Sequence, residues 1–345
     1  MKTPESLQAV ARAGAGTNNI PLEEMAQKGI VVFNTPGANA NAVRELAVAG
    51  LLLSSRRIVQ GIEWVETLKG KGEDVPKLVE KGKAQFAGPE LRGKTLGVIG
   101  LGGVGALVAN AGKALDMNVV GYDPYITVDH AWMLSRSIAR ANSLDELLAR
   151  SDYVSVHVPL IEQTKGSFNA AAFKKMKKGA TLLNLSRGGL VVEADVLAAL
   201  QSGRLRAYVT DFPSDALIGV EGVIAIPHLG ASTPESEDNC VMMASQQIDA
   251  YLKCGAIRNS VNYPNCELES VHGHRVAVLH QNVPNVVSAL TGVLSQYGIN
   301  IASMVNKSRG GYAYTVLDLD DAFERKSEIS AQMRGLEPVY RVRYW

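Results

Sequence analysis

The sequence has little of what would mark several other classes of protein. Its 345 residues include three cysteines, Cys240, Cys254 and Cys266, which form no CxxC pair, so neither a disulfide framework nor a zinc site is expected. Lys plus Arg (35) nearly equals Asp plus Glu (34), which gives no reason to expect a nucleic acid or an anionic membrane as partner. The longest apolar run, 47–53, is far shorter than the ~20 residues of a membrane helix. The start lacks the basic and apolar regions of a signal peptide, so a cytoplasmic protein is expected.

The length predicts two or three domains, and the middle of the chain predicts an α/β architecture. Between residues 89 and 230 short apolar runs alternate with segments of helical spacing. Such alternation indicates right-handed βαβ units and a Rossmann-type, doubly wound parallel sheet covered on both faces. The expected strands are 95–99, 118–122, 153–158, 181–185, 208–210 and 223–226, and the expected helices are 103–115, 144–149, 170–176 and 193–201.

The first 36 residues offer only two short strands, 7–13 and 30–33, around a helix at 22–28. A piece this small rarely folds alone. We expect it to join the helix at 235–253 in an incomplete, flavodoxin-like substrate lobe, with a helix at 38–59 crossing to the sheet domain. A cleft between two such lobes is a usual place for a small ligand.

After residue 260 the pattern changes. A polar stretch reads as a linker, and the order that follows is β-α-β-β-α-β, which is typical of a ferredoxin-like domain. Its expected elements are 275–280, 284–297, 299–307, 312–319, 322–334 and 339–344. The expected domains are 1–37 (first part of the substrate lobe), 38–229 (the Rossmann-type sheet domain), 230–262 (return to the lobe), 263–273 (linker) and 274–345 (C-terminal domain).

The strongest functional signal is the glycine-rich turn GLGGVG at 100–105, between an expected strand and an expected helix. Alone such a turn is weak evidence, and it can be a turn that binds nothing. Here Asp123 follows a second strand, 18 residues beyond Gly105. A carboxylate at that place accepts hydrogen bonds from a ribose 2′-hydroxyl and repels a 2′-phosphate, which favours NAD over NADP.

A dehydrogenase also needs a group that takes or gives a proton. His228 comes just after the last expected strand, where open α/β sheets bind ligands. Arg187 follows another strand and could bind a carboxylate with two hydrogen bonds. Asp215 could orient the histidine. Taken singly, each has a structural interpretation as well: a loop histidine, a strand-end cap and a turn former.

Three segments together resemble the D-isomer-specific 2-hydroxyacid dehydrogenases: GLGGVG, SRGG at 186–189 and PHLGAST at 227–233. The C-terminal domain resembles ACT regulatory domains, which bind small amino acids between paired domains. The resemblance implies that Arg187 binds the substrate carboxylate, His228 is the acid/base and Asp215 holds His228. The implied cofactor residues are Gly100, Gly102, Gly103, Val104, Gly105, Asp123, His157, Val158, Pro159, Thr164, Ser186, Thr210, Asp211 and Gly230. The implied substrate residues are Gly14, Ala15, Gly16, Asn39 and Arg187, and those for regulatory L-serine are His280, Asn282 and Asn300.

The resemblance implies NAD-dependent oxidation of 3-phospho-D-glycerate in serine synthesis, with feedback by L-serine, in a homodimer or homotetramer. The alternatives are a silent NAD-responsive interaction protein, a serine-sensing scaffold, and a reductase of another 2-oxo acid such as hydroxypyruvate. Asp215 stands where the family has glutamate, and Thr210 where it has an aspartate that Asp211 could replace. The family carries a further stretch before the segment at Leu7. His272 and His274 lack the other ligands of a metal site, so no metal is expected.

Overall fold

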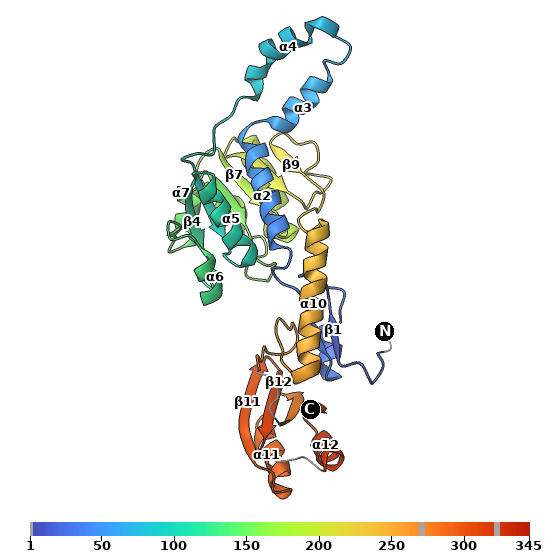
Figure 1. Cartoon of the computed structure of the whole chain (residues 1–345). Coiled ribbons are helices and arrows are strands. Elements are labelled where there is room, and N and C mark those ends of the chain that lie inside the picture. The colour runs from blue at the N-terminus through green and yellow to red at the C-terminus, as the bar shows by residue number, and fades with distance from the viewer. Residues whose placement is uncertain (1–2, 269–272, 321–324) are drawn as a thin grey trace. The chain divides into compact units, whose positions relative to one another are not determined.

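The computed structural model describes residues 3–268, 273–320 and 325–345, and the chain forms two compact units (Figure 1). One consists of Met1–Ala38 and Glu237–Trp345, and we call it the split unit. The other consists of Asn39–Ser236, and we call it the central unit. The finer domain boundaries expected from the sequence stay predictions.

A parallel β-sheet forms the middle of the central unit. Its strand order is β5-β4-β3-β6-β7-β8-β9, and each neighbouring pair is parallel. The chain starts in the middle at β3, runs to one edge, and returns to build the other half, which is the doubly wound arrangement predicted from the sequence. The strands are β3 (Thr95–Ile99), β4 (Asn118–Tyr122), β5 (Ala139–Arg140), β6 (Tyr153–Val156), β7 (Ala180–Asn184), β8 (Leu205–Thr210) and β9 (Val223–Ala225).

Helices cover both faces of this sheet, because strands that are apolar on both sides must be buried on both. On one face, Leu51 and Val108 are fully buried against strand residues such as Val98. On the other, Leu147 and Phe173 pack in a second core. The first face carries α2 (Ala40–Ser55) and α5 (Gly103–Ala114), and the second carries α7 (Leu144–Arg150), α8 (Ala170–Lys175) and α9 (Glu193–Gln201). A short helix, α6 (Val128–Met133), packs beside α5.

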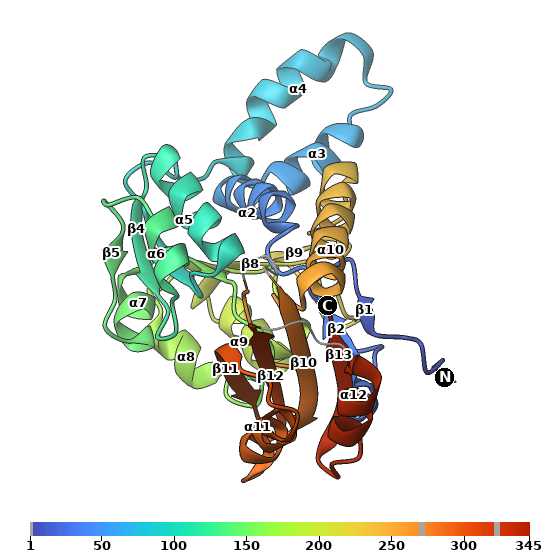
Figure 2. The same ribbon diagram turned by 60° about the horizontal axis from the view of Figure 1, so that its bottom comes forward.

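The single helix expected at 38–59 is wrong, because the chain breaks it into α2 and α3 (Ile58–Glu66). The returning chain passes so close to the end of α2 that a Cβ on Gly88 would lie 2.2 Å from the carbonyl oxygen of Ser55. Arg56 is extended there (φ −124°, ψ 146°). In Figure 2, α3 and α4 (Val75–Gly82) extend from the sheet as an arm.

The C-terminal part of the split unit has the β-α-β-β-α-β order that the sequence predicts. Its strands form an antiparallel sheet in the order β11-β12-β10-β13. Two helices cover one face (Figure 2). Val278, Leu290 and Ile329 are fully buried together there. The elements are β10 (His274–Gln281), α11 (Val286–Gln296), β11 (Ile301–Arg309), β12 (Tyr312–Leu319), α12 (Lys326–Arg334) and β13 (Val339–Tyr344).

The other face of that sheet packs on the N-terminal piece. Phe33, Tyr251 and Tyr263 are fully buried in one core with sheet residues Leu279 and Tyr314. Two strands of three residues each could not bury a core alone, so the C-terminal sheet supplies the apolar surface. The remaining elements here are β1 (Ala9–Ala11), α1 (Leu22–Gln27), β2 (Val31–Phe33), which pairs in parallel with β1, and α10 (Pro234–Cys254) from Glu237 onward.

The segment expected to be a linker begins inside this core. Just before it, the Asn262 side chain accepts a hydrogen bond from the Val32 N–H and donates one to the Ile30 carbonyl, both at 2.9 Å. Tyr263 is fully buried, and its hydroxyl donates to the Ala26 carbonyl at 2.6 Å. The chain before residue 269 is therefore anchored to β2, and residues 269–272 lie outside the described part.

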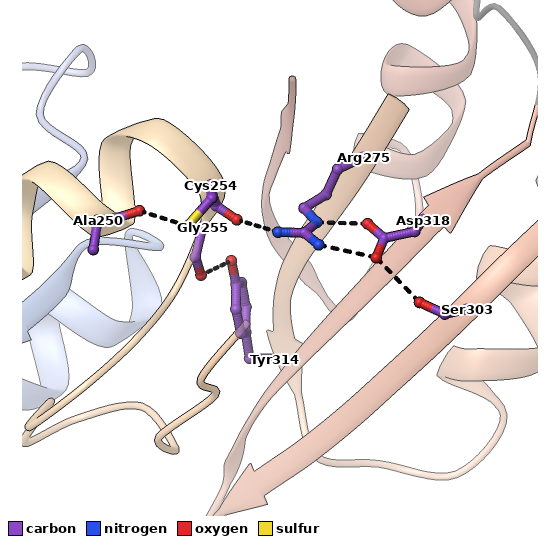
Figure 3. A network of polar contacts seen from close by, with 7 residues as sticks. All are labelled: Ala250, Cys254, Gly255, Arg275, Ser303, Tyr314 and Asp318. Carbon is purple, nitrogen blue, oxygen red and sulfur yellow. Dashed lines mark hydrogen bonds and ion pairs between the residues drawn. The ribbon is translucent and has the colours of Figure 1, made fainter. Parts of the chain in front are cut away.

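Side chains of the C-terminal sheet also hold the end of α10 (Figure 3). Arg275 donates to the carbonyl oxygen of Cys254 at 2.8 Å, and Tyr314 donates to that of Gly255 at 2.8 Å. From β13, Arg343 donates to the carbonyl oxygen of Tyr251 at 3.0 Å. Cationic donors at a helix C-terminus satisfy its last carbonyls and the negative end of its dipole.

Within the described ranges, no helix has the length and hydropathy needed to cross a bilayer. The same residues hold no group of three or more His, Cys, Asp or Glu side chains placed to bind a metal ion. His272, half of the histidine pair noted in the sequence, is outside those ranges.

Candidate active site

The glycine-rich turn joins β3 to α5, and its backbone packing requires glycine at two positions. Gly100 has φ +83°, and a Cβ there would lie 2.6 Å from the carbonyl oxygen of His157. A Cβ on Gly105 would lie 1.8 Å from the carbonyl oxygen of Gly100. At Gly102, in contrast, no described atom lies within 4 Å of the Cβ position, and no side chain caps α5 there. The start of α5, with Gly103 and Val104, is thus open to a phosphate group.

Asp123 lies directly after β4 and organises this turn. Its carboxylate accepts the Leu101 N–H and the Tyr125 N–H, each at 2.8 Å. A carboxylate has about four acceptor sites, so it can accept ribose hydroxyls as well. The open Gly102, the uncapped helix start and this carboxylate fit the diphosphate and ribose of NAD.

The loop after β6 packs against the glycine-rich turn at Gly100. His157 Nε2 is 2.8 Å from the Ser155 hydroxyl, and burial lowers the pKa of His157 to about 4, so its imidazole is neutral near neutral pH. The Ser186 hydroxyl donates to the Val158 carbonyl at 2.6 Å, and the Thr164 hydroxyl donates to the Pro159 carbonyl at 2.6 Å. The five implied cofactor residues of this region therefore lie in the loops after β6 and β7, at the carboxyl end of the sheet.

Three adjacent parallel strands, β7, β8 and β9, end at the same edge. Arg187 comes three residues after β7, Asp211 one residue after β8, and His228 three residues after β9. Arg187 is held by its neighbours: its Nη1 donates to the Ser186 carbonyl at 2.7 Å, and its own carbonyl accepts from Asn184 at 2.9 Å. Topology thus places Arg187 and His228, which the sequence singles out, at the same edge of the sheet.

The His228 ring is exposed and lies against Phe212, with the ring centroids 4.7 Å apart and the planes at 50°. Sequence reasoning missed Phe212. The sequence feature that could have identified Phe212 is its position in the loop after β8. That strand lies beside β9, which His228 follows. An aromatic neighbour restricts the orientations of the imidazole.

The expected contact between Asp215 and His228 is not found: among the described residues no hydrogen bond or ion pair joins them, and Asp215 is exposed. It lies in a tight turn in which the Leu217 N–H bonds the Ser214 carbonyl at 3.0 Å. Asp211, one residue beyond buried Thr210, is itself buried; burial raises its pKa, and the nearby His228 acts in the opposite direction. The role of Asp215 stays a prediction.

The implied substrate loop lies in the split unit and is held by β2 and the chain after it. The Gly14 N–H donates to the Thr35 hydroxyl at 2.7 Å, and the Asn34 side chain donates to the Ala15 carbonyl at 2.8 Å. Gly16 follows in the same loop, while Asn39, in the central unit, is the N-cap residue of α2. Substrate binding by these residues stays a prediction.

The implied serine residues all have partners within the C-terminal domain. His280 is buried; its Nδ1 donates to the Gln281 carbonyl at 2.7 Å, and its Nε2 is 2.8 Å from the Thr315 hydroxyl. Asn282 donates to the Gly310 carbonyl at 3.1 Å, and Asn300 donates to Asp320. A ligand at these positions would have to replace some of these bonds.

Comparison with known proteins matches residues 48–230 to the family described as "D-isomer specific 2-hydroxyacid dehydrogenase, NAD binding domain". The chain is similar to a D-3-phosphoglycerate dehydrogenase of Archaeoglobus fulgidus, with 37% identity over 77% of this chain and 49% of that protein. It is also similar to one of Bacillus subtilis, with 29% identity over 95% of this chain and 59% of the other. The chain thus spans about half the length of the curated relatives it matches most strongly.

Solved structures of several 2-hydroxyacid dehydrogenases are also similar to this chain. D-mandelate dehydrogenase of Rhodotorula graminis matches with a TM-score of 0.67 and 27% identity, over 77% of each chain. An NAD⁺-bound 3-phosphoglycerate dehydrogenase of Entamoeba histolytica matches with a TM-score of 0.58 and 29% identity, over 76% of this chain and 77% of that one. The family match covers more than half of the chain, and the glycine turn and Asp123 lie within it. The chain therefore belongs to the D-isomer specific 2-hydroxyacid dehydrogenase family and carries its NAD-binding domain.

Proposed function

We propose that the chain oxidises 3-phospho-D-glycerate to 3-phosphohydroxypyruvate with NAD. The observation that carries this proposal is the position of Arg187 after β7 and of His228 after β9, two strands separated by β8, on the edge of the sheet that also bears the glycine turn and Asp123. Ligands of open α/β sheets bind at this edge. A guanidinium for a carboxylate and an imidazole for a hydroxyl proton are what a 2-hydroxy acid requires.

In this reaction Arg187 binds the substrate carboxylate with two hydrogen bonds, which also draws electrons from the adjacent C2 carbon. His228 accepts the proton of the C2 hydroxyl and becomes an imidazolium. When bound, NAD supplies the acceptor for the hydride that leaves C2. The products are the 2-oxo acid, NADH and one proton held on His228, so charge and atoms balance.

The choice of 3-phosphoglycerate among 2-hydroxy acids is supported by the relatives, since those of Archaeoglobus fulgidus and Bacillus subtilis carry that name. Arg187 by itself recognises a carboxylate and does not select the rest of the substrate. A panel of 2-hydroxy acids and 2-oxo acids therefore has to accompany the phosphorylated acid in the assay.

The test is NADH formation by the full chain with 3-phosphoglycerate, beside glycerate, lactate and 2-hydroxyglutarate, and NADH consumption with hydroxypyruvate. We expect the phosphorylated acid to have the highest kcat/KM, and His228→Ala to lose about 10²-fold or more in kcat. His130→Ala, at a half-buried histidine of α6, is the matched control. Tight NADH binding without turnover of any acid would contradict the proposal and favour the scaffold alternative.

We further propose that L-serine regulates this activity by binding at His280, Asn282 and Asn300, and that the chain pairs with copies of itself. A neutral imidazole and two amides can together satisfy an ammonium and a carboxylate. Calorimetric titration with L-serine, with Asn282→Ala as the variant, and light scattering with and without serine test both statements. If L-serine gives no heat of binding with the wild-type chain, the proposed regulation is contradicted. If the chain is a monomer at all concentrations, the proposed pairing is contradicted.

A further inference from the structure

Asn184 is a buried polar residue at the end of an apolar strand. It is the last residue of β7, pairs with Val156 of β6 and with Thr210 of β8, and is 0% exposed. Before it in the strand, Leu182 and Leu183 are fully buried in the two cores on either side of the sheet. A buried amide is costly unless its polar atoms have partners, so the partners of this amide indicate its role.

The Asn184 side chain binds backbone groups of the loop that follows it. Its Oδ1 accepts the Ser186 N–H at 3.3 Å and the Arg187 N–H at 3.4 Å, and its Nδ2 donates to the Arg187 carbonyl at 2.9 Å. That carbonyl also accepts the Leu190 N–H, at the longer distance of 3.4 Å. One amide thus binds both the N–H and the C=O of Arg187, and this turn sets the direction in which the chain leaves the strand.

The chain just beyond Arg187 has little intrinsic stiffness. Gly188 and Gly189 follow it, and glycine lacks the side chain that restricts a backbone. The guanidinium is bound to the neighbouring residue, since Nη1 donates to the Ser186 carbonyl at 2.7 Å. That carbonyl belongs to the same turn. The positions of both the Arg187 backbone and its guanidinium therefore depend on the strand end and on the Asn184 amide.

We propose that Asn184 is a positioning residue, whose buried amide fixes the backbone of Arg187 and so directs the guanidinium toward the carboxylate of a 2-hydroxy acid. This inference rests on the proposed function for what Arg187 binds. Two parallel hydrogen bonds to a carboxylate require a guanidinium of fixed orientation. A displacement of about 1 Å in a group that holds the substrate costs up to about 10²-fold in rate. The competing interpretation is a turn former that only stabilises the fold.

Steady-state kinetics of Asn184→Ala and Asn184→Ser in the full chain separate the two interpretations. Alanine removes all three hydrogen bonds, and we expect the KM for the acid to rise about 10-fold or more while the KM for NAD changes by less than about 2-fold. Serine keeps a short acceptor for the N–H groups and should recover part of this loss. If the alanine variant does not fold, the serine variant serves for the comparison. An acid KM that does not rise, or an equal rise in both KM values, would overturn the proposal.

Asn169→Ala is the matched control, because Asn169 makes the same set of hydrogen bonds at the start of α8. Its Oδ1 accepts the Ala171 and Ala172 N–H groups at 3.0 and 3.3 Å, and its Nδ2 donates to the Gly166 carbonyl at 3.0 Å. We expect this variant to have a lower melting temperature, as Asn184→Ala does, and KM values within about 2-fold of the wild type. An equal rise in its acid KM would attribute the effect at Asn184 to lost stability and overturn the proposal.

A double-mutant cycle with Arg187→Ala shows whether Asn184 acts through the guanidinium. Once the guanidinium is absent, its orientation no longer matters. In the Arg187→Ala background we therefore expect Asn184→Ala to change kcat/KM by less than about 2-fold. A loss as large as in the wild-type background would overturn the proposal.

The last test does not depend on turnover. Hydrogen exchange of the backbone amides, followed by NMR, should show the Ser186 and Arg187 N–H groups about 10-fold or more less protected in folded Asn184→Ala than in the wild type. Unchanged protection overturns the positioning role even if the chain is an active dehydrogenase. Lost protection in a chain that oxidises no 2-hydroxy acid upholds the placement of Arg187 by Asn184 and rejects the proposed function instead.

Discussion

Arg275 and Asp318 form a two-bond ion pair on neighbouring strands of the C-terminal sheet, with Nε 2.5 Å from Oδ1 and Nη2 2.9 Å from Oδ2 (Figure 3). The Arg275 side chain is only 4% exposed, and its Nη1 also donates to the end of α10. Ser303 donates to the same carboxylate at 3.1 Å. One buried guanidinium thus joins two strands and a helix that are far apart in the sequence.

Asp318→Asn should therefore destabilise the chain. Removing the charge weakens the two hydrogen bonds that this carboxylate accepts from a buried guanidinium, and we expect a loss of about 2 kcal/mol in the free energy of unfolding. Urea denaturation at neutral pH measures this loss. The control is Asp145→Asn, which removes an ion pair with Lys175 whose side chains are 48–60% exposed. We expect this substitution to lower the free energy of unfolding by less than about 1 kcal/mol. Equal effects of the two substitutions would contradict the burial argument.

The same pair predicts a pH dependence. Arg275 lowers the pKa of Asp318 below its usual value of 3.8. A carboxyl group whose folded pKa is lowered stabilises the fold above its unfolded pKa, and this contribution is lost as pH falls through the folded value. The stability difference between wild type and Asp318→Asn should therefore shrink as pH falls below 3.8. A constant difference over that range would show that charge is not the cause.

Asn262→Ala tests whether the chain before residue 269 is part of the core. The amide makes two buried hydrogen bonds to β2, and its loss leaves the Val32 N–H and the Ile30 carbonyl without partners. We expect a loss of about 2–3 kcal/mol in the free energy of unfolding. Asn265→Ala, an exposed residue of the same segment, should change stability by no more than ~0.5 kcal/mol. Similar unfolding midpoints for the two variants would contradict the anchoring of this segment to β2.

Gly102→Ala and Gly105→Ala should separate cofactor binding from folding. At Gly105 a methyl group would meet backbone 1.8 Å away, so we expect a lower melting temperature. At Gly102 a methyl group meets no described atom within 4 Å, so the melting temperature should hold while NADH affinity falls about 10-fold or more. Fluorescence titration with NADH and thermal unfolding measure the two effects. Unchanged affinity in Gly102→Ala would place the diphosphate elsewhere.

Asp123→Asn should reduce the preference for NAD over NADP. The asparagine carbonyl can replace only part of the carboxylate, which accepts two N–H groups at 2.8 Å and would also accept ribose hydroxyls. Loss of its charge removes the repulsion of a 2′-phosphate. We expect NADH affinity to fall about 10-fold and that for NADPH to fall less. The ratio of the two dissociation constants is the measurement, and an unchanged ratio would exclude Asp123 from selectivity.

Local sequence patterns determined much of the fold. Strand β3 and helix α9 occur at the predicted residues, because a run of apolar residues or a 3.6-residue spacing is enough to specify them. The glycine turn likewise follows from short-range constraints, since Gly100 and Gly105 are required by backbone atoms close by. The order of elements then implies the parallel sheet.

Tertiary structure decided what depends on distant residues. The break after Ser55 lies where the returning chain packs against it at Gly88, a contact that no pattern within 38–59 reveals. The sequence could mark both Asp211 and Asp215 as acids near a strand end, but only packing buries the first and exposes the second. Propensity and periodicity act over a few residues, whereas burial is set by the whole chain, and burial is what gives a carboxylate its influence on a neighbouring imidazole.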